Sequence, residues 1–174
     1  MRNSLRVALI GLIALVAVGW FFANSKAPTA NPSIQTPVQD AKSVTLVVDF
    51  GKASGKPVQS FDLQNVKSNA TGWDLFALAN LNVQGTQQFP AGFVCRIEGW
   101  PTETSQDCAD TPAYSEGHWA YYVTSIQLGG GWLLSGQGAA THIPDCAAYE
   151  GWAWVAAGQE SVAPRFDVQP RGCK

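Results

Sequence analysis

The sequence predicts an α+β fold in which a small mixed sheet is covered on one side by a single helix. Two segments of alternating apolar residues open the folded part, one helical pattern follows, and further strand patterns occupy the second half of the chain. This order of two strands, one helix and then more strands is typical of a layered α+β domain. The helix would leave the opposite face of the sheet open to solvent or to a bound molecule.

The first two strands and the helix are predicted from local patterns. Val, Leu and Phe alternate over Ser43 to Phe50, and the alternation returns more weakly over Val58 to Leu63, so the two segments form a hairpin. Thr71 with Asp74 resembles a capping box in which Asp replaces Glu, and it predicts a helix over residues 71–82. The apolar stripe expected to face the sheet comprises Trp73, Phe76, Ala77 and Leu81.

The remaining strands follow the helix. A third strand is predicted over Phe93 to Ile97, and a long loop with few apolar residues separates it from a fourth strand over His118 to Ile126. Two further strands, Trp132 to Leu134 and Gly151 to Ala156, are divided by Gly-rich segments. Residues 43–174 are therefore expected to form one domain.

The composition restricts the function. The chain has 174 residues, of which 46% are hydrophobic and only 14% charged, which is enough apolar material for a core. Three of the 11 basic residues lie within the first 26 positions, so the remainder carries eight cations against 13 acidic residues. An acidic body lacks the Lys and Arg clusters that bind phosphate backbones. We therefore expect no nucleic-acid partner.

Residues 1–25 have the pattern of a signal peptide or an N-terminal membrane anchor. Arg2 and Arg6 precede an uncharged run, Val7 to Ala23, whose length suits either a long signal-peptide core or a short membrane span. Small residues near its end favour cleavage, whereas the aromatic residues at 20–22 favour a retained helix. We favour the uncleaved anchor. Either outcome places the folded domain outside the cytoplasm, in the cell envelope or secreted.

The segment that follows the apolar run is expected to be a linker. Residues 26–42 contain three Pro among Ala, Thr, Asn, Ser and Gln, and such a composition cannot bury a core. The linker would tether the domain to the membrane through the N-terminal helix.

Export changes the interpretation of the four cysteines. In an oxidising compartment, Cys95, Cys108, Cys146 and Cys173 are expected to form disulfides, and they allow three pairings. We predict a Cys95–Cys108 bond that closes the loop between them and a Cys146–Cys173 bond that pins the C-terminal tail. No CxxC pair occurs, so we expect no metal centre.

Aromatic side chains supply the candidate binding site. On the fourth strand, Trp119 and Tyr121 project to one face and Tyr122 to the other. We expect Trp119 and Tyr121 to pack in the core and Tyr122 to face solvent, where exposed rings usually mark a contact site. The candidate ligand-binding residues are Trp100, Tyr122, Trp132 and Trp154.

Three segments of the chain resemble a known family. Phe93 to Gly99 (FVCRIEG), Trp119 to Val123 (WAYYV) and Gly151 to Trp154 (GWAW) look like the small β-grasp-like domain at the C-terminus of transcobalamin and intrinsic factor. That domain also occurs alone in exported bacterial proteins, similar to ones associated with energy-coupling-factor transporters. The resemblance covers residues 43–158. It implies a β-grasp fold and the binding of a ligand or partner without catalysis.

Two departures limit what this resemblance implies. The family usually continues from the WAYYV-like strand into an Asn-Gly turn, whereas this chain has Thr124 and Ser125 there. The large helical domain that encloses cobalamin in the vitamin carriers has no counterpart in this sequence, so the resemblance assigns no cobalamin and no cofactor.

Catalytic alternatives have weaker support in the sequence. His118 and His142 could meet Asp145 and Glu150 to bind a metal or move a proton, but a structural role is the simpler interpretation. A carbohydrate-active hydrolase would need two converging carboxylates, and no spacing selects a pair among Glu98, Glu103, Glu116 and Glu150. We therefore expect no catalytic residues. The leading hypothesis is a tethered domain that binds a small-molecule ligand, and the alternative is an assembly module that docks on a membrane transporter.

Overall fold

The computed structural model describes residues 41–124 and 130–173. The predicted signal or anchor at 1–25 and nearly all of the predicted linker at 26–42 lie outside this range. Within the described ranges, no helix is long and apolar enough to cross a membrane.

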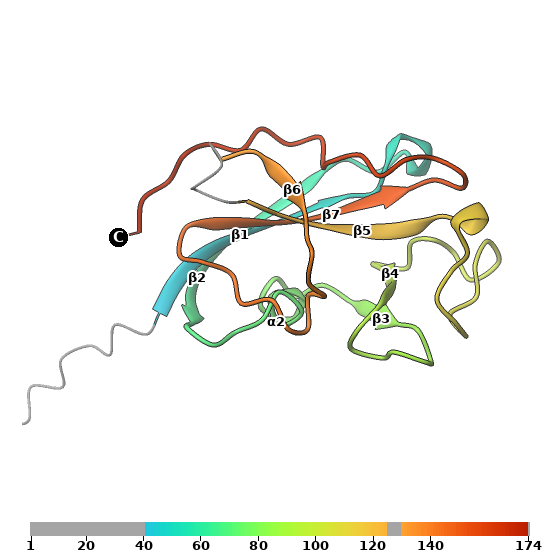
Figure 1. The fold of residues 1–174 in the computed structure, drawn as a ribbon, viewed down its shortest axis with the longest axis horizontal. Coiled ribbons are helices and arrows are strands. Elements are labelled where there is room, and N and C mark those ends of the chain that lie inside the picture. The colour runs from blue at the N-terminus through green and yellow to red at the C-terminus, as the bar shows by residue number, and fades with distance from the viewer. Residues whose placement is uncertain (1–40, 125–129, 174) are drawn as a thin grey trace, which may run out of the picture. The chain divides into compact units, whose positions relative to one another are not determined.

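The main sheet has five strands in the order β2-β1-β7-β5-β6 (Figure 1). Strands β1 and β7 are parallel, and the neighbouring pairs β1–β2, β5–β7 and β5–β6 are antiparallel. The fold is therefore a mixed α+β fold with a small mixed sheet, as the sequence predicts. The strand bounds are β1 Ala41–Asp49, β2 Gln59–Lys67, β5 His118–Thr124, β6 Trp132–Leu134 and β7 Ala148–Val155.

A second sheet of two strands was not expected. Strand β4, Val94–Ile97, is the predicted third strand, but it pairs with the short strand β3, Val83–Gly85, instead of joining the main sheet. All four residues of β4 are buried, because this small sheet packs against the main one. The apolar pattern therefore identifies β4 as a strand without identifying its partner.

The helix α2 is shorter than predicted and spans only Asp74–Leu78. The expected cap is present: the backbone N–H and the hydroxyl of Thr71 both donate to Asp74 Oδ2 at 2.9 Å. Asn80, with φ 55°, turns the chain into the left-handed region and ends the helical segment. Phe76 is buried as predicted, whereas Ala77 is exposed, so that part of the predicted stripe is wrong.

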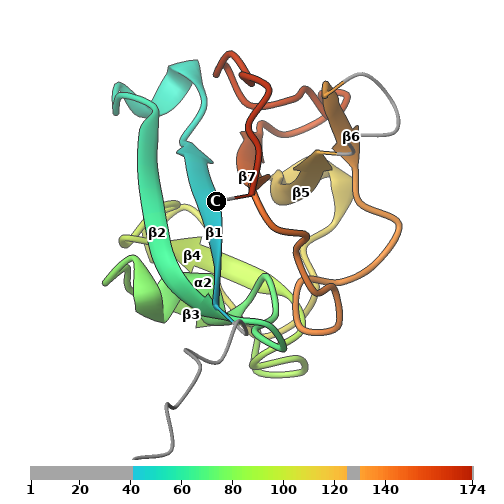
Figure 2. The same cartoon turned by 90° about the vertical axis from the view of Figure 1, so that its left-hand side faces the viewer.

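The main core lies between the sheet and the layer made by α2, β3 and β4 (Figures 1 and 2). Trp119 and Tyr121 belong to this core and are 4% and 8% exposed, which confirms the prediction that they are packing residues. Trp152 lies between Phe76 and Tyr121, with ring centroids 5.4 and 4.8 Å away. Aliphatic partners from the sheet and its cover include Val44, Leu46, Val48, Leu63, Leu75, Val94 and Ile97.

The opposite face of the sheet is also covered, so the expectation of an open second face is wrong. The C-terminal segment, residues 156–173, runs back across that face (Figure 1, red). The indole N–H of Trp132 donates to the backbone carbonyl of Phe166 at 3.0 Å, and Arg171 lies 4.7 Å from the centre of the Tyr149 ring. Cover is needed because this face is apolar as well, and its buried residues include Val47, Ala120, Tyr122, Tyr149 and Val155.

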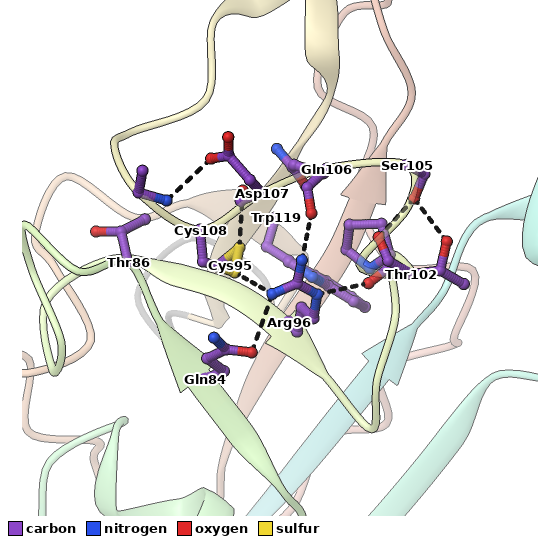
Figure 3. The surroundings of a disulfide bond; sticks show 12 residues. Gln84, Thr86, Cys95, Arg96, Thr102, Ser105, Gln106, Asp107, Cys108 and Trp119 are labelled. Atoms are coloured by element: carbon purple, nitrogen blue, oxygen red, sulfur yellow. Dashed lines mark hydrogen bonds between the residues drawn. A yellow bond between two sulfur atoms is a disulfide. The ribbon is translucent and has the colours of Figure 1, made fainter.

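Both predicted disulfides are present, Cys95–Cys108 and Cys146–Cys173. The first closes the long loop around the buried guanidinium of Arg96 (Figure 3). Arg96 Nε donates to the Pro101 carbonyl at 3.0 Å, and its terminal nitrogens donate to Gln84, the Gln106 carbonyl and Cys108 Sγ. The loop is therefore held by a buried cation as well as by a covalent bond. Two disulfides are typical of an extracellular or otherwise oxidising compartment.

Substitution of Gly151 by alanine is expected to lower the free energy of unfolding by about 1 to 3 kcal/mol. An added Cβ would lie 2.7 Å from the Trp132 ring and 2.8 Å from Pro164, so the C-terminal segment would have to shift. Gly136→Ala is the control, since nothing lies within 4 Å of its Cβ position. Thermal unfolding followed by calorimetry measures both variants, and equal stabilities would contradict this packing.

Candidate functional site

The predicted aromatic site divides into two separate groups. Trp100 and Trp154 lie together, with ring centroids 6.4 Å apart, beside the core residue Trp119. Tyr122 and Trp132 pack on the other face of the sheet, under the C-terminal segment. Tyr122 is only 5% exposed, so the expectation of a solvent-facing ring is wrong for it. The other three are half-buried, and the four do not form one surface.

Trp154 borders a cavity of about 520 Å³ at one end of the main sheet. This cavity, here called the terminal cavity, lies where β1 and β7 end and where the C-terminal segment and the 3-10 helix η1, Lys52–Ser54, meet. The cavity is partly open to solvent, and its volume is inside the range of about 300 to 1,000 Å³ that is usual for small-molecule sites. Its apolar lining comes from Ala53, Ala153, Ala156, Val162 and Ala163.

An ion pair between the buried Asp49 and the partly exposed Arg165 forms the polar part of this cavity. The carboxylate of Asp49 accepts hydrogen bonds from Arg165 Nη2 at 2.6 Å, from Arg165 Nε at 2.9 Å and from the backbone N–H groups of Gly51 and Arg165. Burial by itself would raise the pKa of Asp49, but the bonds from Arg165 outweigh it and hold the pKa below its usual value. The carboxylate is therefore ionised and saturated at neutral pH.

The sequence contained one sign of this arrangement. Asp49 stands between Val48 and Phe50 at the apolar end of its strand, and a buried carboxylate requires a cationic partner. Its partner, Arg165, lies 116 positions later in a segment without a regular pattern. Periodicity could therefore indicate that Asp49 is paired, but not with which residue.

A second polar cluster lies inside the main core. Glu150 is fully buried; Tyr121 donates its hydroxyl to Glu150 Oε2, and His142 Nε2 lies 3.2 Å from Oε1. Burial raises the pKa of Glu150 against the opposing hydrogen bonds, and the hydrogen bond to Glu150 raises the pKa of His142. The negative charge of Asp145 also raises the pKa of His142, and the positive charge of Lys42 lowers the pKa of both His142 and Glu150. It joins the 136–147 loop to β5 and β7.

The residues considered for catalysis are distributed over different elements. His142 does meet Glu150, but His118 sits on the other face of the sheet, where burial lowers its pKa. Glu98 accepts a hydrogen bond from the Asn82 side chain at 3.2 Å, and Glu116 accepts one at 2.8 Å from the backbone of Ala113. Among the described residues, no group of three His, Cys, Asp or Glu side chains could hold a metal ion.

Comparison with known proteins adds no relative: no protein-family model matches the chain, and no curated protein matches its sequence. The transcobalamin-like resemblance therefore stays a prediction.

Proposed function

We propose that this chain is an exported, membrane-tethered, non-catalytic binding domain that holds a small ligand in the terminal cavity. The observation that carries the proposal is a preformed apolar space that borders the Asp49–Arg165 ion pair, in which the buried carboxylate is saturated by hydrogen bonds. Small-molecule sites commonly combine an apolar wall with a few fixed polar groups. Val162 gives further support, since this apolar side chain on the cavity wall is 68% exposed.

We also propose that the fold is β-grasp-like. The parallel neighbours β1 and β7, each flanked by an antiparallel strand, support this proposal, as does the position of α2 between β2 and β5 in the chain. The extra strands β3, β4 and β6 would be additions to that scaffold. In this arrangement the ligand site lies at the end of the central strands, and of the four aromatic residues that the sequence suggested it includes Trp154 alone.

Blocking the cavity mouth tests the proposed function. Ala53 is exposed on η1 and lines the cavity, so Ala53→Trp should fill the mouth without disturbing the core. We expect the purified full-length chain to enhance the fluorescence of the neutral apolar probe N-phenyl-1-naphthylamine. Ala53→Trp should weaken its binding about tenfold, because losing the burial of about two methylene groups, at about 0.8 kcal/mol each, costs close to the roughly 1.4 kcal/mol of a tenfold change.

The matched control is Ala77→Trp, which adds the same ring at an exposed alanine on α2. It should bind the probe as the unmodified chain does. No binding by the unmodified chain, or equal weakening by both variants, would remove the terminal cavity as the site.

A further inference from the structure

We propose that the ligand of the terminal cavity is a small organic anion, with a compact apolar body and one carboxylate or comparable acidic group. This inference rests on the proposed function, because it names the ligand class of the same cavity. It follows from three features of the site: the size of the apolar wall, the balance of charge at the rim, and the way in which Arg165 is held.

The apolar lining of the terminal cavity favours a ligand with a compact apolar part. Three of its residues, Ala153, Ala156 and Ala163, have the smallest apolar side chain, and together with Val162 they leave about 520 Å³ empty. A ligand of one or two fused rings would bury its apolar surface there. A polar or extended ligand would leave this wall without a partner.

The charged groups of the lining have an excess of one cation. They are Asp49, Arg165 and Lys52, and the Asp49 carboxylate is already saturated by its four hydrogen bonds. Arg165 therefore neutralises Asp49, and the exposed Lys52 remains. A net positive site on a domain of acidic composition is complementary to an anion and would draw one toward this end of the sheet.

Arg165 is held in a position to take part in this recognition. Its Nε and Nη2 bind Asp49, and its Nη1 makes no hydrogen bond within the described ranges. The Arg165 side chain lines the terminal cavity and is 42% exposed. Because Asp49 already fixes the guanidinium, a ligand carboxylate would meet a donor that loses little freedom on binding. A cationic ligand would instead be repelled by Lys52.

Three probes with one naphthalene body test the charge of the ligand: 1-naphthoate, 1-naphthamide and 1-naphthylmethylammonium. Titration calorimetry on the purified full-length chain should show the naphthoate binding about tenfold more tightly than the amide, because a charge-assisted hydrogen bond is added. The ammonium probe should bind most weakly. The preference for naphthoate should shrink as salt is raised, since Lys52 is exposed.

Reversing the charge of a single lysine tests whether the preference for naphthoate arises at the terminal cavity. Lys52→Glu should weaken naphthoate binding about tenfold and leave naphthamide binding nearly unchanged. Lys67→Glu is the matched control, because Lys67 is exposed at the opposite end of the sheet, where it pairs with Ala41 at the start of β1. It should leave both affinities unchanged.

Equal affinities for naphthoate and naphthamide, or tightest binding of the ammonium probe, would overturn the anion assignment. So would equal effects of the two charge reversals. In these cases the proposed function would still stand if N-phenyl-1-naphthylamine binds and Ala53→Trp weakens its binding. Failure of all four probes to bind the unmodified chain would overturn both proposals.

Discussion

Replacement of both Cys146 and Cys173 by alanine is expected to lower the free energy of unfolding by about 3.5 kcal/mol, the cost of releasing a loop of this size in the unfolded state. The two residues are 27 positions apart, against 13 for Cys95 and Cys108. The corresponding loss for the shorter loop is about 3 kcal/mol. Urea unfolding of the two double variants and the unmodified chain measures both values.

The C-terminal segment should remain docked in the folded state of the Cys146→Ala/Cys173→Ala variant. Arg165 still binds Asp49, and Trp132 still donates to the Phe166 carbonyl. Amide hydrogen exchange should therefore rise mainly in the last few residues, near position 173, while the backbone of β7 stays protected. Full loss of protection along β1 and β7 would show instead that the covalent bond alone keeps the second face covered.

The second large effect is expected in the pH dependence of stability. Because the pKa of Glu150 and that of His142 are both raised in the folded state, the folded cluster binds more protons than the unfolded chain. Its stabilising contribution is present at acid pH and is lost as pH rises, above about 4.5 for Glu150 and above about 6.5 for His142. Between pH 5 and pH 9 we therefore expect the free energy of unfolding to fall.

Glu150→Gln isolates this contribution. The substitution keeps the shape of the side chain and the acceptor for the Tyr121 hydroxyl, and it removes both the buried acid and the cause of the raised His142 pKa. The difference in unfolding free energy between the unmodified chain and this variant should therefore decrease as pH rises. A difference that is constant with pH would contradict the assigned pKa directions.

His118→Gln provides a control with the opposite sign. Burial lowers the pKa of His118, so its folded form resists protonation and the unmodified chain loses stability as pH falls below about 6.5. Relative to His118→Gln, the unmodified chain should therefore become less stable on the acid side. If the stability differences for Glu150→Gln and His118→Gln change with pH in opposite directions, the contribution of the Glu150–His142 cluster can be distinguished from that of the other titratable groups.

The sequence allowed most of the main sheet to be predicted, because alternation of apolar residues is a local signal. Strand β6 was predicted with its observed bounds, and β1, β2 and β7 within a few residues at most ends. Strand β5 begins at His118 as predicted, and the last two positions of its predicted range, 125–126, lie outside the described residues. The length of the helix was overestimated. The hydrogen bond between Thr71 and Asp74 forms as predicted, but Asn80, whose left-handed conformation ends the segment, leaves no clear pattern in the sequence. The disulfide pairing followed from the loops it closes.

The site was harder to predict because it depends on contacts between distant parts of the chain. Residues 156–173 have no period and few large apolar side chains, so nothing local indicates that they cover a sheet. Their docking depends on specific pairs such as Arg165 with Asp49 and Arg171 with Asp62. Tyr122 was therefore placed on an open face that the folded chain covers, and Trp154 was selected for its ring although four of the residues that line the cavity beside it are alanines.

The course of β1 has a mechanical consequence. This strand enters the sheet at Ala41, runs between β2 and β7, and ends at Asp49 beside the terminal cavity. A pulling force between a captured molecule and the polypeptide that precedes Ala41 would act along the strand axis. The ladders on both sides of β1 would then be loaded in shear, so that many hydrogen bonds resist together instead of opening one after another.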